Sequence, residues 1–90
     1  MSVMNNQSDV LVVDVREPWE FDFGHAEGSI NIPLSSVPYE IEQLRAVSKP
    51  IVLVCASGNR SGQATAWLQA QGFNNVSNGG AWQNALQYAR

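Results

Sequence analysis

The 90-residue sequence predicts an α/β fold with a central, mostly parallel sheet that is flanked by helices on both faces. Segments with the pattern of strands alternate with segments that have the pattern of helices, which is typical of parallel sheets. The segments 10–15 and 51–54 are almost entirely apolar, as expected of strands buried on both faces. We find no repeat and no linker, so residues 1–90 are expected to form a single domain.

The first half of the chain is divided by proline and glycine. The elements expected there are a strand at 10–15, a short helix at 17–23, a β-like segment at 29–32 and a helix at 37–47. Pro18 and Pro38 suit the first turns of the two helices, because that position needs no N–H. Gly24 is expected to end the first helix, and Pro33 the β-like segment.

The second half repeats the alternation. The elements expected there are a strand at 51–54, a helix at 61–71, a strand at 73–77, a turn at 78–80 and a helix at 81–90. Gly72 suits the left-handed residue that ends a helix. The apolar faces of the two helices are expected to consist of Ala64, Trp67 and Leu68 in the first and of Trp82, Ala85, Leu86 and Ala89 in the second.

Cys55 is the only cysteine, and it directly follows the strand 51–54. A single cysteine excludes an intramolecular disulfide and a zinc site built from several thiolates. A lone cysteine is often only a small buried apolar residue. Ligands, however, bind at the carboxyl ends of parallel strands, so we expect the Cys55 side chain in a crevice.

The residues after Cys55 favour a reactive thiolate. Gly58 allows the backbone to curl, so that successive N–H groups turn towards one point. The following helix presents its N-terminus, and Arg60 adds a permanent positive charge. Together these groups favour thiolate over thiol and attract anions. The simpler interpretations are a solvated surface charge for Arg60 and a helix cap for Ser61.

The charge distribution agrees with an anionic substrate. The net charge is −3, all acidic residues lie within 9–42, and the chain from Arg45 onward holds four basic residues and no acidic one. Chance in a chain with few charges would explain this equally well. The net charge argues against nucleic acid as a partner. No apolar run approaches the roughly 20 residues that span a membrane, and residues 1–9 do not resemble a secretory signal. We therefore expect a cytoplasmic protein.

Residues 55–61 (CASGNRS) resemble the C-x-x-G-x-R-S active-site loop of single-domain rhodaneses. Residues 13–17 (VDVRE), 20–33 (EFDFGHAEGSINIP) and 78–82 (NGGAW) resemble further elements of that family in the same order. The resemblance implies a thiosulfate sulfurtransferase. Cys55 would attack the outer sulfur of a donor such as thiosulfate and become a persulfide, and an acceptor such as cyanide or a thiol would then remove that sulfur.

The resemblance also implies roles for other residues. The loop that would bind the substrate and cradle the sulfur consists of Ala56, Ser57, Gly58, Asn59, Arg60 and Ser61. Asp14 and Arg16 are expected to form an ion pair that braces this loop. His25, the only histidine and so the only ordinary general base near neutral pH, is expected mainly to satisfy buried backbone groups. No metal or organic cofactor is implied, and the protein is expected to be a monomer or weak homodimer.

The loop at Cys55 allows three other interpretations. Cysteine phosphatases use C-x5-R, whereas Arg60 follows Cys55 after four residues and no Asp follows soon to act as a general acid. A non-enzymatic, regulatory binding module is less expected, because such modules typically lack the cysteine. A persulfide carrier for a protein partner, with little activity towards thiosulfate and cyanide, would use the same chemistry at Cys55, so the sequence leaves this alternative open.

Overall fold

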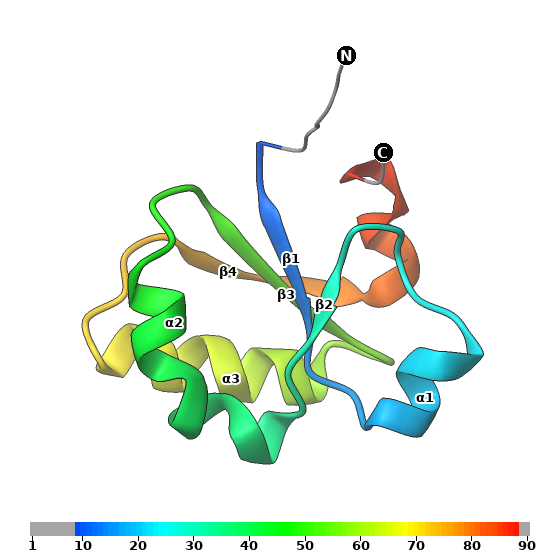
Figure 1. Cartoon of the computed structure of the whole chain (residues 1–90), viewed down its shortest axis with the longest axis horizontal. Coiled ribbons are helices and arrows are strands. Elements are labelled where there is room, and N and C mark those ends of the chain that lie inside the picture. Colours follow the sequence, from blue (N-terminus) through cyan, green and yellow to red (C-terminus); the bar gives the residue numbers. More distant parts are fainter. Residues whose placement is uncertain (1–8, 89–90) are drawn as a thin grey trace.

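The computed structural model describes residues 9–88, in which a four-stranded sheet has the order β2-β1-β3-β4. The strands are β1 (Leu11–Asp14), β2 (Ile30–Asn31), β3 (Ile51–Cys55) and β4 (Val76–Ala81). All three strand pairs within the described residues are parallel. The predicted parallel sheet is therefore confirmed, with the valine-rich β1 and β3 at its centre (Figure 1).

Helices cover both faces of the sheet, as predicted. The helical elements are α1 (Pro18–Phe23), the 3₁₀ helix η1 (Leu34–Glu40), α2 (Ile41–Arg45), α3 (Asn59–Ala70) and the 3₁₀ helix η2 (Trp82–Tyr88). In Figure 1, α2 and α3 lie along one side of the sheet, and the orange-red segment after β4 lies on the other. Alternate residues of β3 take part in the two cores: Leu53 and Cys55 pack on the α3 side, and Val54 packs with Ala85 of η2.

The helix expected at 37–47 differs from the structure. The segment is η1 followed by the short α2. Pro38 lies inside η1 rather than in the first turn of an α-helix. Because proline has no N–H and its ring crowds the preceding turn, regular α-helix begins only at Ile41. Val37 and Leu44 are nevertheless buried, so the segment still packs its apolar side onto the sheet.

Helix α3 begins at Asn59, two residues before the expected start at Ser61. Gly58, with a φ of +100°, occupies the N-cap position, and Ser61 is fully buried in the first turn. The simpler interpretation, in which Ser61 caps the helix, is therefore wrong. On the apolar face, Ala64 and Leu68 are buried as expected, whereas Trp67 is 37% exposed.

The last strand and the glycines after it were also assigned differently. The strand expected at 73–77 begins only at Val76, and residues 78–80 belong to β4 rather than to a turn. A Cβ on Gly79 would lie 2.5 Å from Cγ1 of Val52, so glycine is needed there for close packing against β3. The pairing of β3 with β4 shifts register between Leu53 and Val54, and this irregularity accommodates the glycines.

The terminal helix expected at 81–90 is the 3₁₀ helix η2 as far as the structure describes it. Ala85 is buried on the sheet and Trp82 packs against the same core, as predicted. Leu86 is 51% exposed, which contradicts its expected inward position. The predicted position of Ala89 lies outside the described residues.

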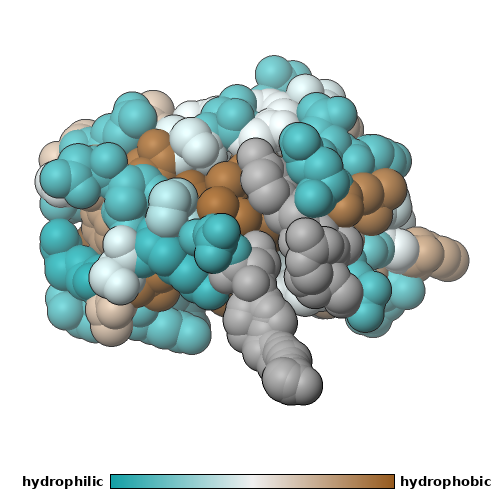
Figure 2. Space-filling model, turned by 90° about the horizontal axis from the view of Figure 1, so that it is seen from above, coloured by the Kyte–Doolittle hydropathy of each residue, from teal (hydrophilic) through white to brown (hydrophobic). Residues whose placement is uncertain are grey.

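Hydrophobic side chains reach the surface in separate patches between hydrophilic ones on the face shown in Figure 2. The large exposed hydrophobic residues come from four elements: Trp19 and Phe23 from α1, Tyr39 from η1, Trp67 from α3 and Leu86 from η2. Within residues 9–88, no helix combines the length and the apolar character needed to cross a membrane.

Candidate active site

Cys55 is the last residue of β3, at the carboxyl edge of the sheet, and none of its surface is exposed. The β3 strand is buried along its whole length. After Cys55, only three residues connect β3 to α3. The thiol therefore lies where a strand end, a tight loop and the first turn of a helix meet.

Two backbone N–H groups and one hydroxyl surround the sulfur. The N–H of Gly58 is 3.0 Å from Cys55 Sγ, and both the N–H and the Oγ of Ser61 are 3.4 Å from it. The loop reaches this shape because Gly58 adopts a positive φ. A side chain there would also lie 3.2 Å from the Cα of Gly80. The curled loop directs donors towards the sulfur, as the sequence led us to expect.

Two opposing effects determine the acidity of Cys55. Burial raises the pKa of the thiol. Hydrogen bonds from the Ser61 hydroxyl and from the N–H groups of Ser61, Ser57 and Gly58 favour the thiolate, and their combined effect is larger. The result is a pKa of about 7, below the ordinary value of 9.0. A substantial fraction of Cys55 is therefore the nucleophilic thiolate at neutral pH.

Arg60 lies in the first turn of α3, and its guanidinium is held by a carboxylate from α1. Its Nη1 and Nη2 donate to Oε1 and Oε2 of Glu20 at 2.7 and 3.1 Å. Hydrogen bonding to Glu20 is the main cause that raises the pKa of Arg60, and the negative charge of Cys55 raises it further. Glu20, from the acidic first half of the sequence, thus partly neutralises the positive charge of Arg60 near Cys55. Sequence analysis missed this partner, because Glu20 is distant in the chain.

The Arg60–Glu20 pair predicts a pH-dependent contribution to stability. Hydrogen bonds from Arg60 and from the N–H of Glu17 lower the pKa of Glu20 from 4.5 to about 2. Because the folded-state pKa is the lower one, the contribution is complete above pH 4.5 and is lost as the pH falls towards 2. Glu20→Gln should therefore be less stable than the wild type near neutral pH, and the difference should shrink across this window.

Urea unfolding followed by tryptophan fluorescence at several pH values would measure this difference. Glu42→Gln, in the exposed surface of α2, is the matched control for removal of a carboxylate. A difference between Glu20→Gln and the wild type that stays constant down to pH 2 would contradict the assignment.

Asp14 and Arg16 form the predicted ion pair, and both are buried. Arg16 Nε is 2.9 Å from Asp14 Oδ1, and Nη2 is 2.8 Å from Oδ2. Nη2 also donates to the carbonyl of Gly24 at 2.7 Å, and the guanidinium lies 5.0 Å above the ring of Trp82. The contacts of the pair therefore join the end of β1 to the end of α1 and the start of η2. Direct bracing of residues 56–61 stays a prediction.

His25 differs from its expected place. Its Nδ1 lies 2.7 Å from the carbonyl oxygen of Phe21, and its ring stacks on the Phe21 ring with centroids 3.7 Å apart. The residue and its hydrogen bond are exposed, so the expectation that it satisfies buried backbone groups was wrong. These contacts close the turn after α1, which explains the position without any chemistry.

Asn78 is a site residue that sequence analysis missed. Its Oδ1 accepts from Ser61 Oγ at 2.6 Å and from the N–H of Gly80 at 3.0 Å. Its Nδ2 donates to the carbonyl of Gly58 at 3.1 Å. One side chain of β4 thus contacts both residues whose donors surround the sulfur. The only signal in the sequence was a polar residue before a glycine pair, which we assigned to a turn.

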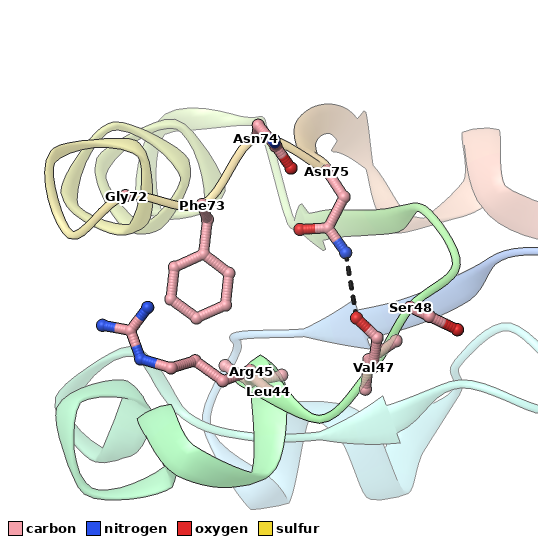
Figure 3. A pocket seen from close by; sticks show the side chains of 8 residues that line it. All are labelled: Leu44, Arg45, Val47, Ser48, Gly72, Phe73, Asn74 and Asn75. Atoms are coloured by element: carbon pink, nitrogen blue, oxygen red, sulfur yellow. Dashed lines mark hydrogen bonds between the residues drawn. The ribbon is translucent and has the colours of Figure 1, made fainter.

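A cavity of about 250 Å³ lies beside the C-terminal end of α3 (Figure 3). Cys55 precedes the N-terminal end of the same helix. Its lining comes from α2 and the segments after α2 and α3, and consists of Leu44, Arg45, Val47, Ser48, Gly72, Phe73, Asn74 and Asn75. Its main polar groups are already engaged: Asn75 Nδ2 donates to the carbonyl of Val47 at 3.2 Å, and the Arg45 guanidinium lies 5.0 Å over the ring of Phe73. The cavity is therefore separate from the chemistry at Cys55.

Comparison with known families matches residues 2–83 to the rhodanese-like domain. This chain belongs to the rhodanese-like domain family. Among solved structures it is similar to a rhodanese from E. coli, solved with anions, at 32% identity and a TM-score of 0.76, covering 83% of this chain and 89% of that one. It is also similar to a human single-domain sulfurtransferase at 27% identity and a TM-score of 0.67, covering 91% of this chain and 85% of that one.

Curated relatives of this rhodanese-like domain are much longer than the chain itself. The tRNA uridine(34) hydroxylase of Salmonella agona is 35% identical over 81 residues, which is 84% of this chain but 23% of that protein. The chain thus spans about a quarter of the length of the curated relatives it matches. The family resemblance seen in the sequence is confirmed for residues 2–83, and the similar structures include a single-domain sulfurtransferase.

Proposed function

We propose that this rhodanese-like domain carries sulfur as a persulfide on Cys55. It takes the sulfur from an anionic donor such as thiosulfate and passes it to cyanide or a thiol. The observation that carries the proposal is the position of Cys55 Sγ, which is surrounded by donors from Gly58 and Ser61 at 3.0 to 3.4 Å. Such donors stabilise negative charge on sulfur, both in the thiolate and in the persulfide.

Neither the transfer of sulfur to Cys55 nor its transfer to the acceptor needs an external oxidant. In the first, the Cys55 thiolate attacks the outer sulfur of thiosulfate, a new S–S bond forms, and sulfite leaves with the electron pair of the broken bond. In the second, cyanide attacks the outer sulfur of the persulfide, thiocyanate leaves, and the thiolate is restored. The pKa of about 7 means that the attacking form is available at neutral pH. The loop from Ala56 to Ser61 is proposed to hold the transferred sulfur through its backbone N–H groups.

The length of the curated relatives favours one alternative, in which the domain delivers sulfur to a protein partner. The chain covers only 23% of the hydroxylase from Salmonella agona, so a rhodanese-like domain also serves as a part of larger proteins. In this alternative the persulfide forms on Cys55 in the same way, but a protein thiol removes the sulfur more efficiently than cyanide does.

Intact-mass spectrometry of the reduced protein, before and after incubation with thiosulfate, tests the proposal. We expect a gain of one sulfur atom that cyanide then removes with release of thiocyanate. A gain that protein thiols remove and cyanide does not would favour the carrier for a protein partner. The absence of any gain from both thiosulfate and mercaptopyruvate would contradict a persulfide-forming role.

Arg60→Ala tests whether the guanidinium handles the anionic donor. We expect kcat/KM for thiosulfate to fall by the factor that corresponds to a loss of ~1–3 kcal/mol in transition-state stabilisation, as for hydrogen bonds to charged groups. Glu20→Gln is the matched control, because it removes the partner of Arg60 and leaves the cation in place. We expect this control to raise kcat/KM. An unchanged value in Arg60→Ala would show that Arg60 serves only as the partner of Glu20.

A further inference from the structure

The hydroxyl of Ser61 has one proton and two acceptors within reach. Its Oγ lies 2.6 Å from Asn78 Oδ1 and 3.4 Å from Cys55 Sγ. The orientation of the Asn78 amide follows from its backbone partners: Oδ1 faces the N–H of Gly80, and Nδ2 faces the carbonyl of Gly58. The oxygen of an amide only accepts, so the 2.6 Å contact uses the Ser61 proton, and the bond from this hydroxyl to Cys55 described above forms only when the hydroxyl turns away from Asn78.

We propose that Asn78 is a positioning residue that holds the Ser61 hydroxyl proton away from Cys55 and thereby limits ionisation of the thiol. While Ser61 donates to Asn78, the lone pairs of Oγ face the sulfur. This arrangement suits the thiol, which can donate its S–H to Oγ. The thiolate instead requires the hydroxyl to turn towards the sulfur and to leave Asn78. The inference deepens the proposed function, since it concerns the nucleophile of that reaction.

The burial of Ser61 makes this competition matter. Ser61 has no exposed surface, so its hydroxyl proton goes to Asn78 Oδ1 or to Cys55 Sγ rather than to water. The 2.6 Å bond to Asn78 is shorter than the 3.4 Å contact with the sulfur. Turning the hydroxyl towards the thiolate therefore gives up the bond to Asn78, and this loss offsets part of the stabilisation that Ser61 offers the thiolate.

Other charges near Cys55 stay in place when Asn78 is changed. Arg60 of α3 acts on Cys55 and is paired with Glu20 of α1. Asp14 and Arg16, at the end of the neighbouring strand β1, neutralise one another. The segments β4 and η2, which approach the site from the Asn78 side, contain no acidic or basic residue. A change in the ionisation of Cys55 caused by Asn78 therefore has to act through hydrogen bonds.

The test is a double-mutant cycle on the full chain, with Asn78→Ala and Ser61→Ala alone and together. The readout is the thiolate absorbance of Cys55 against pH, with Cys55→Ser as the blank. Cys55 is the only thiol, so nothing else contributes a thiolate signal. We expect Asn78→Ala to move the titration midpoint about one pH unit lower, because the hydroxyl becomes free to donate to the sulfur.

The Ser61→Ala background separates this role from a structural one. Without the hydroxyl, Asn78→Ala is expected to leave the midpoint unchanged. An equal shift in both backgrounds would show that Asn78 acts only by anchoring the carbonyl of Gly58, and would overturn the inference. That carbonyl keeps its bond from the N–H of Gly62 at 2.9 Å, so the loop retains an anchor in the variant.

Asn78→Asp keeps the inference testable if the alanine variant does not fold. The carboxylate retains acceptors for Ser61 and Gly80 and binds the hydroxyl more strongly. Its negative charge also raises the midpoint by itself, so the readout is the difference between Asn78→Asp alone and Asn78→Asp with Ser61→Ala. We expect the larger rise when the hydroxyl is present, and an equal rise in both backgrounds would overturn the inference. These titrations do not depend on sulfur transfer. A failed mass gain with both thiosulfate and mercaptopyruvate would therefore contradict the proposed function alone, and an absent coupling between Asn78 and Ser61 would contradict this inference alone.

Discussion

Cys55→Ser is expected to abolish persulfide formation and to lower sulfur transfer by about four orders of magnitude or more. The chain has no second cysteine that could take over the role. A hydroxyl ionises at far higher pH than a thiol, so the donors from Gly58 and Ser61 cannot make it a nucleophile near neutrality. An oxygen also forms no stable counterpart of the persulfide.

The same substitution should leave the fold intact. The new hydroxyl is polar and buried, but the N–H groups of Gly58 and Ser61 already point at its position and can satisfy it. Intact mass after thiosulfate treatment and the rate of thiocyanate release would measure the loss, and circular dichroism would check the fold. Ser57→Ala, in the exposed part of the loop, is the control that should keep the mass gain. Sulfur transfer that persists in Cys55→Ser would refute the mechanism.

Asp14→Ala is expected to lower the free energy of unfolding by about 3–5 kcal/mol, because it leaves Arg16 buried without its counter-charge. Asp14 is fully buried and Arg16 is 5% exposed, so water cannot replace the carboxylate. The lost oxygens accept four hydrogen bonds, from the N–H, Nε and Nη2 of Arg16. This loss is a large share of the total stability of a small domain.

Urea unfolding of Asp14→Ala would measure this effect. Glu20→Gln is the matched control, since the Arg60–Glu20 pair is partly exposed and its loss should cost less than about 1 kcal/mol. The double variant Asp14→Ala with Arg16→Met removes the uncompensated charge and should recover part of the stability. Equal losses in Asp14→Ala and Glu20→Gln would contradict the importance of burial.

The parts of the fold that the sequence predicted well are those that local pattern determines. The apolar runs that became β1 and β3 needed no knowledge of their neighbours, and Pro18 marked the start of α1. Pro38 was misjudged, because its effect on the preceding turn depends on where the helix begins. The extent of β4 was missed, because the need for Gly79 arises from Val52 on another strand.

The same distinction holds at the candidate site. The sequence predicted that a curled loop and a helix start follow Cys55, because these parts are consecutive in the chain. The partners of the loop were not, because Glu20 and Asn78 reach Arg60 and Ser61 from distant segments. Their contacts depend on how α1 and β4 pack, and a single sequence carries no direct record of that packing.

The parallel sheet also has a consequence for the kinetics of folding. Its strand pairs join residues far apart in the chain, such as Leu11 with Ile51 and Ile51 with Val76. Parallel pairs cannot be nucleated by a tight hairpin, so long loops must close before the contacts stabilise them. We expect refolding in the slower range for small domains, which stopped-flow tryptophan fluorescence would measure. Asn78 reaches Ser61 and Gly58 only once β4 docks, so the final arrangement of the donors around Cys55 should be a late event in the folding of this chain.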